Sequence, residues 1–181
     1  MKRSFVLIIF TVLALSVSAQ KYMTKTGFIG FYSHTSMEDI TADNNQVAGI
    51  VDISTGELVF QVLIKSFHFE RALMEEHFNE NYMDSEKFPK SSFKGKITNL
   101  ASLDLKKVGK YDVVAEGQLT IRDVTKPVTV KGTLEVTATG LNVNTKFKIV
   151  PEDYNIAIPG VVREKIAKDL EVTVIMKYSP M

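Results

Sequence analysis

Polar and apolar residues alternate along several segments of the chain. The clearest alternation runs through residues 128–138, in which every second residue is apolar or small, and the same period of two recurs in residues 110–122, 141–149 and 170–178. Because neighbouring side chains of a β-strand point to opposite faces, this period predicts strands that each bury one face. Weaker alternation predicts further strands over about residues 27–34, 47–53, 57–69 and 92–99.

Clusters of turn-forming residues separate these predicted strands. They are the Asp-Asn-Asn run at 43–45, Ser-Thr-Gly at 54–56, Lys-Pro at 126–127 and Thr-Gly at 139–140. Two interruptions look helical: Ala72–Asn81 carries acidic residues and good helix formers, and Val161–Lys168 follows a Pro-Gly break. The pattern predicts an all-β fold of about eight antiparallel strands with one or two short helices.

A closed barrel buries the one apolar face of every strand, and it also removes exposed sheet edges. A barrel of this size either fills its interior with side chains or holds one small ligand. Small residues at the inward positions Gly95, Ala115, Gly117, Gly132 and Thr145 favour an interior with free space. The alternative is that each small residue pairs with a large one across a filled interior, or marks a bulge.

A membrane barrel is the opposite arrangement, with its apolar side outward. It would place Lys131, Glu135, Lys146 and Lys148 in a narrow lumen and glycines against lipid, and no girdle of aromatic residues marks the strand ends. We therefore predict that the apolar side faces inward and that the protein does not insert stably into a membrane.

The first residues have the three parts of a secretory signal peptide. Lys2 and Arg3 are followed by an apolar run, Phe5–Leu15, and then by the small residues that end at Ala19. The apolar run is too short to span a bilayer. We therefore predict a signal peptide over residues 1–19, one domain over residues 20–181, and export to the periplasm or the extracellular medium. The sequence has no cysteine, so this fold depends on its core and sheet rather than on disulfides.

Charge and motifs exclude several classes of function. The 22 basic and 21 acidic residues nearly balance and form no basic stripe, so no nucleic-acid partner is predicted. The spacing of His68 and His77 matches no familiar metal motif, and no metal or cofactor is predicted. The chain has neither a nucleophile elbow nor a phosphate-binding glycine loop, so no enzymatic activity is predicted.

Several short motifs follow one another in an order typical of one family. Residues 74–93 contain MEEHFN, YMD, KFP and a Phe, residues 117–128 read GQLTIRDVTKPV, and DYNIAIP and KIA occur at 153–159 and 165–167. In this order and spacing the sequence resembles the YceI-like family over nearly all of residues 20–181. One departure is Asp123, where the family commonly has a Gly that permits a left-handed turn; Asp tolerates that conformation better than most residues.

This resemblance implies a lipocalin-like, eight-stranded antiparallel barrel, usually exported. Characterised relatives bind a polyisoprenoid, such as the tail of a quinone, in an elongated apolar pore. Dimers occur among them, so a homodimer is compatible with the resemblance. The predicted function is that of a non-catalytic carrier of an apolar, lipid-like molecule. The alternative is a filled barrel without ligand, acting as a structural or partner-binding module.

Inward strand positions and the predicted helix with its following loop supply the candidate ligand-binding residues. Phe78, Tyr82 and Phe88 are expected to close one end, and His68 to reach a polar headgroup there. For each candidate, ordinary core packing is the alternative. The candidates are Leu58, Phe60, Val62, Ile64, His68, Phe78, Tyr82, Phe88, Phe93, Ile97, Val113, Leu119, Val130, Leu134, Val143, Phe147, Val172 and Val174.

Overall fold

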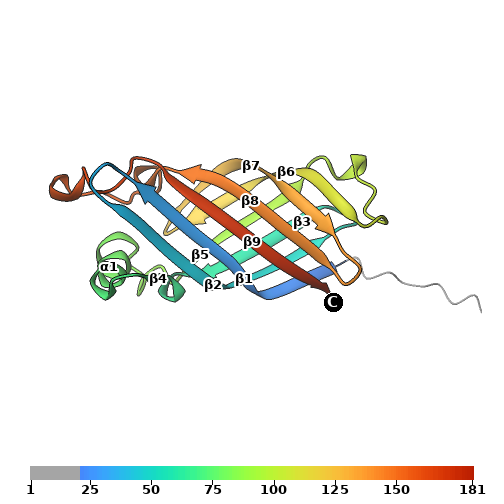
Figure 1. The fold of residues 1–181 in the computed structure, drawn as a ribbon, viewed down its shortest axis with the longest axis horizontal. Helices are drawn as coiled ribbons and strands as arrows, with labels where there is room; N and C mark the ends of the chain where they lie inside the picture. The colour runs from blue at the N-terminus through green and yellow to red at the C-terminus, as the bar shows by residue number, and fades with distance from the viewer. Residues whose placement is uncertain (1–20) are drawn as a thin grey trace, which may run out of the picture.

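A computed structural model describes residues 21–181 as a single closed sheet (Figure 1). The predicted signal peptide, residues 1–19, lies outside the described residues. The strands are β1 (Lys21–His34), β2 (Asp39–Asp52), β3 (Glu57–Leu63), β4 (His68–Phe69), β5 (Lys90–Ile97), β6 (Gly109–Ile121), β7 (Val124–Val136), β8 (Leu141–Ile149) and β9 (Leu170–Pro180).

Eight of these strands close into a barrel. Their order is β1-β9-β8-β7-β6-β5-β3-β2, and β1 pairs again with β2, so every long strand has two antiparallel neighbours. The two-residue β4 is an appendage that pairs only with β2, through Ala42 opposite Phe69 and Asp43 opposite His68. The predicted fold class, an eight-stranded antiparallel barrel, is confirmed.

The two ends of the barrel carry different connections (Figure 1). At one end lie α1 (Ala72–His77), β4 and the connection 150–169 between β8 and β9; we call this the mouth end. At the other, which we call the far end, lie the connection 98–108 between β5 and β6 and the C-terminus. The 3₁₀-helices are Ile64–Ser66, Leu100–Ser102, Pro151–Tyr154 and Gly160–Val162.

One of the two predicted helices is confirmed. The α-helix begins at Ala72, as predicted, but after His77 it continues as a π-helical turn, Phe78–Tyr82. The second predicted helix, over 161–168, is wrong, because only a single 3₁₀ turn, Gly160–Val162, forms there before the chain turns repeatedly. A segment this short is not stable as an isolated helix, and it lies along the mouth rather than on a continuous apolar surface.

The predicted turn at 43–45 is wrong, because these residues lie inside β2. Asn44 is fully buried; its Nδ2 donates to the Leu63 carbonyl at 2.8 Å, and its Oδ1 accepts from the Gln46 amide at 2.8 Å. The pairing of β1 with β2 shifts register beside it, between Gly27 and Ile29. The turn-forming residues therefore serve a β-bulge within a long strand rather than a reversal of the chain.

The turn between β6 and β7 also differs from the prediction. Lys126 and Pro127 lie within β7, and the chain reverses at Arg122 and Asp123 instead. The left-handed residue of this turn is Arg122, with φ of 54°, rather than Asp123. The turns at 54–56 and 139–140 lie where the sequence predicts them.

The apolar side of each strand faces the interior. In β7, Leu134 and Val136 are buried, whereas Lys131 is exposed. Lys146 and Lys148 of β8 are likewise exposed on the outer wall, so the arrangement required for a membrane barrel is not the one observed. Within residues 21–181 no helix is both long and apolar enough to cross a bilayer.

Several strand limits differ from the sequence-based ones. β1 begins at Lys21 and β2 at Asp39, so both are longer than the predicted strands at 27–34 and 47–53. The predicted strand 57–69 is divided, because a 3₁₀ turn follows Leu63 and only His68 and Phe69 return to the sheet.

Candidate ligand-binding cavity

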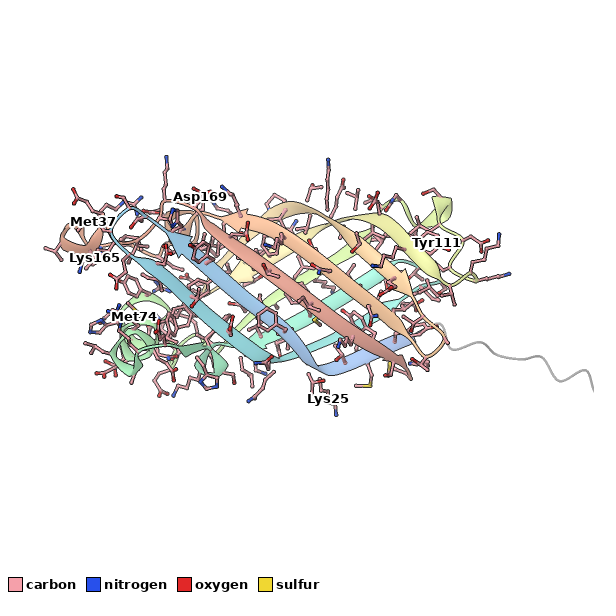
Figure 2. All side chains as sticks on the ribbon, viewed as in Figure 1. Lys25, Met37, Met74, Tyr111, Lys165 and Asp169 are labelled. Atoms are coloured by element: carbon pink, nitrogen blue, oxygen red, sulfur yellow. The ribbon has the colours of Figure 1, made fainter. Side chains whose placement is uncertain are left out.

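The mouth end of the barrel encloses a cavity of about 410 Å³, which we call the wide cavity. Strand residues such as Ile29, Ile149 and Val172 line its wall, and side chains from α1 and the connection 150–169 line its entrance. Figure 2 shows two of these entrance residues, Met74 and Lys165, at the same end of the molecule. This volume lies within the range of small-molecule binding sites.

A second cavity of about 80 Å³, the narrow cavity, lies deeper in the barrel. Its lining is almost wholly apolar and includes Val113, Ala115, Val130 and Val143. Toward the far end the interior is filled: Val136 and Leu141 are buried and line neither cavity.

Three side chains separate the two cavities, because Phe60, Leu119 and Phe147 line both of them. We call these three residues the constriction. They come from β3, β6 and β8, so they reach the interior from three parts of the wall. Phe60 is stacked on Phe93, with ring centroids 5.4 Å apart and an interplanar angle of 18°.

The ring of Phe93 fills the space beside two glycines. Gly95 and Gly117 lie opposite each other on β5 and β6. A Cβ atom on either would meet the Phe93 ring at 2.6 Å or 2.7 Å. For this pair the prediction of free space is wrong and the alternative, a small residue beside a large one, is correct. Ala115, Gly132 and Thr145 do line the narrow cavity.

Four phenylalanine rings hold the mouth segments on the barrel. Phe31 of β1 contacts Phe67, Phe69 and Phe78, with ring centroids 5.7 to 5.8 Å apart. Phe78 also packs on Phe67 and Phe69 at 5.4 Å and 5.0 Å. All four rings line the wide cavity. Tilted and edge-on aromatic contacts of this kind add to the burial of apolar surface, so the cluster fixes the π-helical turn against the strands.

The entrance is polar, in contrast to the wall. Glu38, in the β1–β2 turn, has a side chain that is only 15% exposed; its carboxylate lies 3.2 Å from Arg71 Nη2 and 3.9 Å from Lys165 Nζ. These three residues and His77 all line the wide cavity. The cavity therefore has an apolar depth and a charged rim, which suits an amphiphilic guest.

Arg122 joins the two mouth segments. One of its guanidinium nitrogens, Nη1, donates to the Tyr82 carbonyl at 3.2 Å and to the Asn155 carbonyl at 2.9 Å. Its guanidinium carbon also lies 5.2 Å from the centre of the Phe88 ring. Arg122, Asp84 and Asn155 are the non-glycine residues with positive φ in the described part of the chain, and all three lie at the mouth end. Such conformations cost free energy and concentrate at functional sites.

The structure places most of the candidate residues around the two cavities. Those that line the wide cavity are Phe60, Val62, Ile64, Phe78, Tyr82, Leu119, Phe147 and Val172. Those that line the narrow cavity are Leu58, Phe60, Phe93, Ile97, Val113, Leu119, Val130, Leu134, Val143, Phe147 and Val174. Their contact with a ligand stays a prediction. Burial raises the pKa of Tyr82, so its hydroxyl remains protonated at the mouth.

Two candidates, His68 and Phe88, lie outside both cavities. The His68 side chain is 69% exposed, with its Nδ1 3.5 Å from Glu75 Oε2. The sequence-based prediction put His68 on the same strand face as Ile64, two alternate positions further along. The 3₁₀ turn at 64–66 interrupts the strand, so the alternation does not continue to His68. Phe88 packs against Arg122 instead.

Sequence reasoning missed part of the wide cavity. Phe31 and Ile149 lie on strand faces whose alternation could have identified them, and Ile156 and Ile158 alternate in the NIAIP segment. Phe67 and Phe69 could not be found in this way, because they follow the break in β3. Among residues 21–181 no group of three or more His, Asp or Glu side chains is placed to hold a metal ion.

Several solved structures share this fold. A polyisoprenoid binding domain from Saccharophagus degradans, implicated in plant cell wall breakdown, superposes with a TM-score of 0.77 at 14% identity, over 91% of this chain and 100% of that one. BcnA from Burkholderia cenocepacia gives 0.70 at 13% identity, over 84% and 96%. The YceI protein of Campylobacter jejuni gives 0.56 at 15% identity, over 100% and 99%.

Sequence comparison extends this result from fold to family. No curated protein sequence matches the chain. The family model of the YceI-like domain, however, matches residues 21–178, which include the whole barrel apart from the last residues of β9. On this match, the chain belongs to the YceI-like domain family.

Proposed function

We propose that the protein binds one apolar, lipid-like molecule, a polyisoprenoid, a quinone tail or a fatty chain, in the wide cavity. The observation that carries this proposal is the 410 Å³ space inside the barrel, bounded mainly by aliphatic and aromatic side chains. Apolar walls that border free space gain stability when an apolar guest supplies the missing contacts. The charged rim then meets the polar end of the guest.

The comparisons support this choice of ligand class. The solved domain from Saccharophagus degradans is described as polyisoprenoid binding, and it has the same barrel over nearly all of this chain. At 14% identity the likeness concerns the fold, so the guest of this protein is identified only by the apolar character of the cavity.

The proposal describes an exported carrier that releases its guest unchanged. Export is supported by the pattern of residues 1–19, in which Lys2 and Arg3 precede an apolar run and the small residues ending at Ala19. Sequencing the N-terminus of the protein recovered from outside the cytoplasm tests this part. The expected first residue is Gln20, and a chain that begins at Met1 there contradicts it.

Native mass spectrometry of the protein purified from its producing cells tests ligand binding. We expect a fraction with an added mass that is released on denaturation and is extracted by organic solvent with the same mass. A protein free of any apolar molecule, which also fails to bind added fatty acid, contradicts the carrier and favours a barrel that serves only as a module for a protein partner.

A matched pair of substitutions locates the guest. Val172 lines the wide cavity and is 5% exposed, whereas Val59 is 44% exposed on the outer face of β3. Val172→Trp is expected to fill part of the cavity and lower ligand occupancy at least tenfold, while Val59→Trp leaves it unchanged. Equal occupancy in the two folded variants would place the ligand elsewhere.

A further inference from the structure

We propose that the constriction formed by Phe60, Leu119 and Phe147 sets the length of the apolar chain that the protein accepts, and that this length is medium: about 14 non-hydrogen atoms. The inference rests on the proposed function and specifies its ligand class. A fatty chain of about 12 to 16 carbons, or an isoprenoid of about three units, fits this limit, whereas a long polyisoprenoid does not fit inside.

The length follows from the volume. At roughly 30 Å³ for each non-hydrogen atom, the volume of a water molecule in the liquid, the 410 Å³ of the wide cavity holds about 14 such atoms. The 80 Å³ of the narrow cavity would add about three more if a chain could enter it. The constriction therefore decides whether the bound chain is limited to about 14 atoms or can extend by about three more.

The constriction is held in place by its neighbours. The Phe60 ring is stacked on Phe93, and the Phe93 ring lies over the backbone of Gly95 and Gly117, with no space behind it. A ligand therefore cannot push Phe60 outward without displacing the barrel wall. Phe147 of β8 lies directly opposite the buried Val172 of β9.

The chain enters with its tail first. The rim holds Arg71, Lys165 and Glu38, whereas no charged side chain lines the narrow cavity in the described part of the chain. A polar headgroup is therefore stable only at the mouth, and the end of the tail points toward the constriction.

Binding of saturated fatty acids of roughly eight to twenty carbons to the mature protein measures the limit. Each methylene buried in the wide cavity raises affinity about fourfold. Carbons beyond the limit stay at the mouth in water and add nothing. We expect affinity to rise with length up to about 14 carbons and then to remain level.

Opening the constriction is expected to move this plateau. Phe147→Ala joins the two cavities, and the plateau shifts by about three carbons or more, because the narrow cavity becomes accessible. Phe147→Leu is a milder variant in case the alanine form does not fold. The control is Val59→Ala, which removes atoms from the outer face of β3 and lines neither cavity. Its plateau is expected to stay where it is in the parent protein.

A second substitution tests whether the extra length goes into the narrow cavity. Ala115 is half-buried and lines only that cavity. In the parent protein, Ala115→Leu leaves the plateau unchanged. In the Phe147→Ala variant, the added side chain fills the newly opened space and returns the plateau to about 14 carbons.

The outcomes separate the two proposals. If the parent protein carries no apolar molecule when purified and binds no fatty acid of any length, the proposed carrier function is wrong. If it binds them with affinity that rises through twenty carbons, or if a folded Phe147 variant keeps the parent plateau, the carrier function stands and the length limit is wrong.

Discussion

The strands that enclose about 410 Å³ at the mouth end leave only about 80 Å³ in the next part of the barrel. The same eight strands form both regions, and in both the apolar side faces inward. The wall of the wide cavity is rich in large rings, among them Phe31, Phe67 and Phe78, whereas the glycines Gly95 and Gly117 lie by the narrow cavity.

If small inward side chains alone created free volume, the larger cavity would lie beside the glycines. It lies among the large rings at the mouth instead. Next to the glycines, the rings of Phe93 and Phe60 occupy the available space. At the mouth, the segment 64–89 and the connection 150–169 continue the wall past the ends of the strands. The free volume therefore depends on where the chain extends the barrel, and residue size at inward positions is a poor guide to it.

We expect the largest loss of stability when a side chain of the filled region is truncated. Leu141 is 2% exposed and lines neither cavity, so Leu141→Ala leaves a void in a packed interior and is expected to lower the free energy of unfolding by about 3 to 5 kcal/mol. Ile149→Ala, in the wall of the wide cavity, is expected to cost only about 1 to 2 kcal/mol, because its side chain already faces free space. Urea unfolding at neutral pH measures both values, and equal losses would contradict the contrast between the regions.

Adding a methyl group to a glycine is also expected to change the free energy of unfolding differently in the two regions. In Gly117→Ala the new Cβ would lie 2.5 Å from the Lys94 carbonyl oxygen and 2.5 Å from Gly95 Cα, so backbone must move. We expect a loss of about 2 kcal/mol. Gly160, at the mouth, has no atom within 4 Å of a built Cβ, so Gly160→Ala is expected to be neutral or slightly stabilising. A neutral Gly117→Ala would show that the interior there is loose.

Periodicity predicts the barrel because the later strands, above all β7 and β9, follow it closely. Residues 128–136 alternate in the sequence and alternate again in burial, so the inward set of β7 follows directly from the sequence. The predictions fail where the period breaks. The polar run around Asn44 reads as a turn, yet the buried Asn side chain replaces missing backbone hydrogen bonds inside one long strand.

The mouth is the least predictable part of the site. Phe67 and Phe69 follow a 3₁₀ turn that no residue pattern announces, and their position depends on contacts with Phe31, far away in the sequence. The volume of the wide cavity is likewise a property of how these segments pack, which local preferences do not specify. Sequence therefore identifies most of the strand wall but neither the shape of the entrance nor the position of the constriction.

Loss of the Arg122 hydrogen bonds is expected to loosen the mouth and leave the filled region intact. Arg122→Gln removes the bonds to Tyr82 and Asn155 and should lower the free energy of unfolding by about 1 to 2 kcal/mol. Hydrogen exchange should accelerate in residues 78–82 and 151–155 but not in β7. Arg122→Gly loses the same bonds yet suits the positive φ, so it should be about 1 kcal/mol more stable than the Gln variant. Exchange that accelerates equally throughout the barrel would contradict a separate mouth.

The smallest effect is expected from a buried hydroxyl group beside the narrow cavity, and only at alkaline pH. Tyr178 is 6% exposed, lines the narrow cavity, and its burial raises the pKa of its hydroxyl. In the unfolded chain this group loses its proton near pH 10, whereas in the folded protein it keeps it. The unfolded state is therefore favoured as pH rises above about 10, by about 1.4 kcal/mol at about pH 11.

Tyr178→Phe removes this alkaline loss without removing the ring. Compared with the parent, the variant should lose about 1.4 kcal/mol less stability between about pH 8 and pH 11, measured by urea unfolding at each pH. Tyr82 is the control at the mouth: burial raises its pKa too, but its side chain is less enclosed, so Tyr82→Phe should recover less. Equal recovery in both variants would mean that water reaches the Tyr178 hydroxyl as readily as it reaches the mouth. The interior beyond the constriction would then be as open as the wide cavity, and the two regions would differ in shape but not in packing.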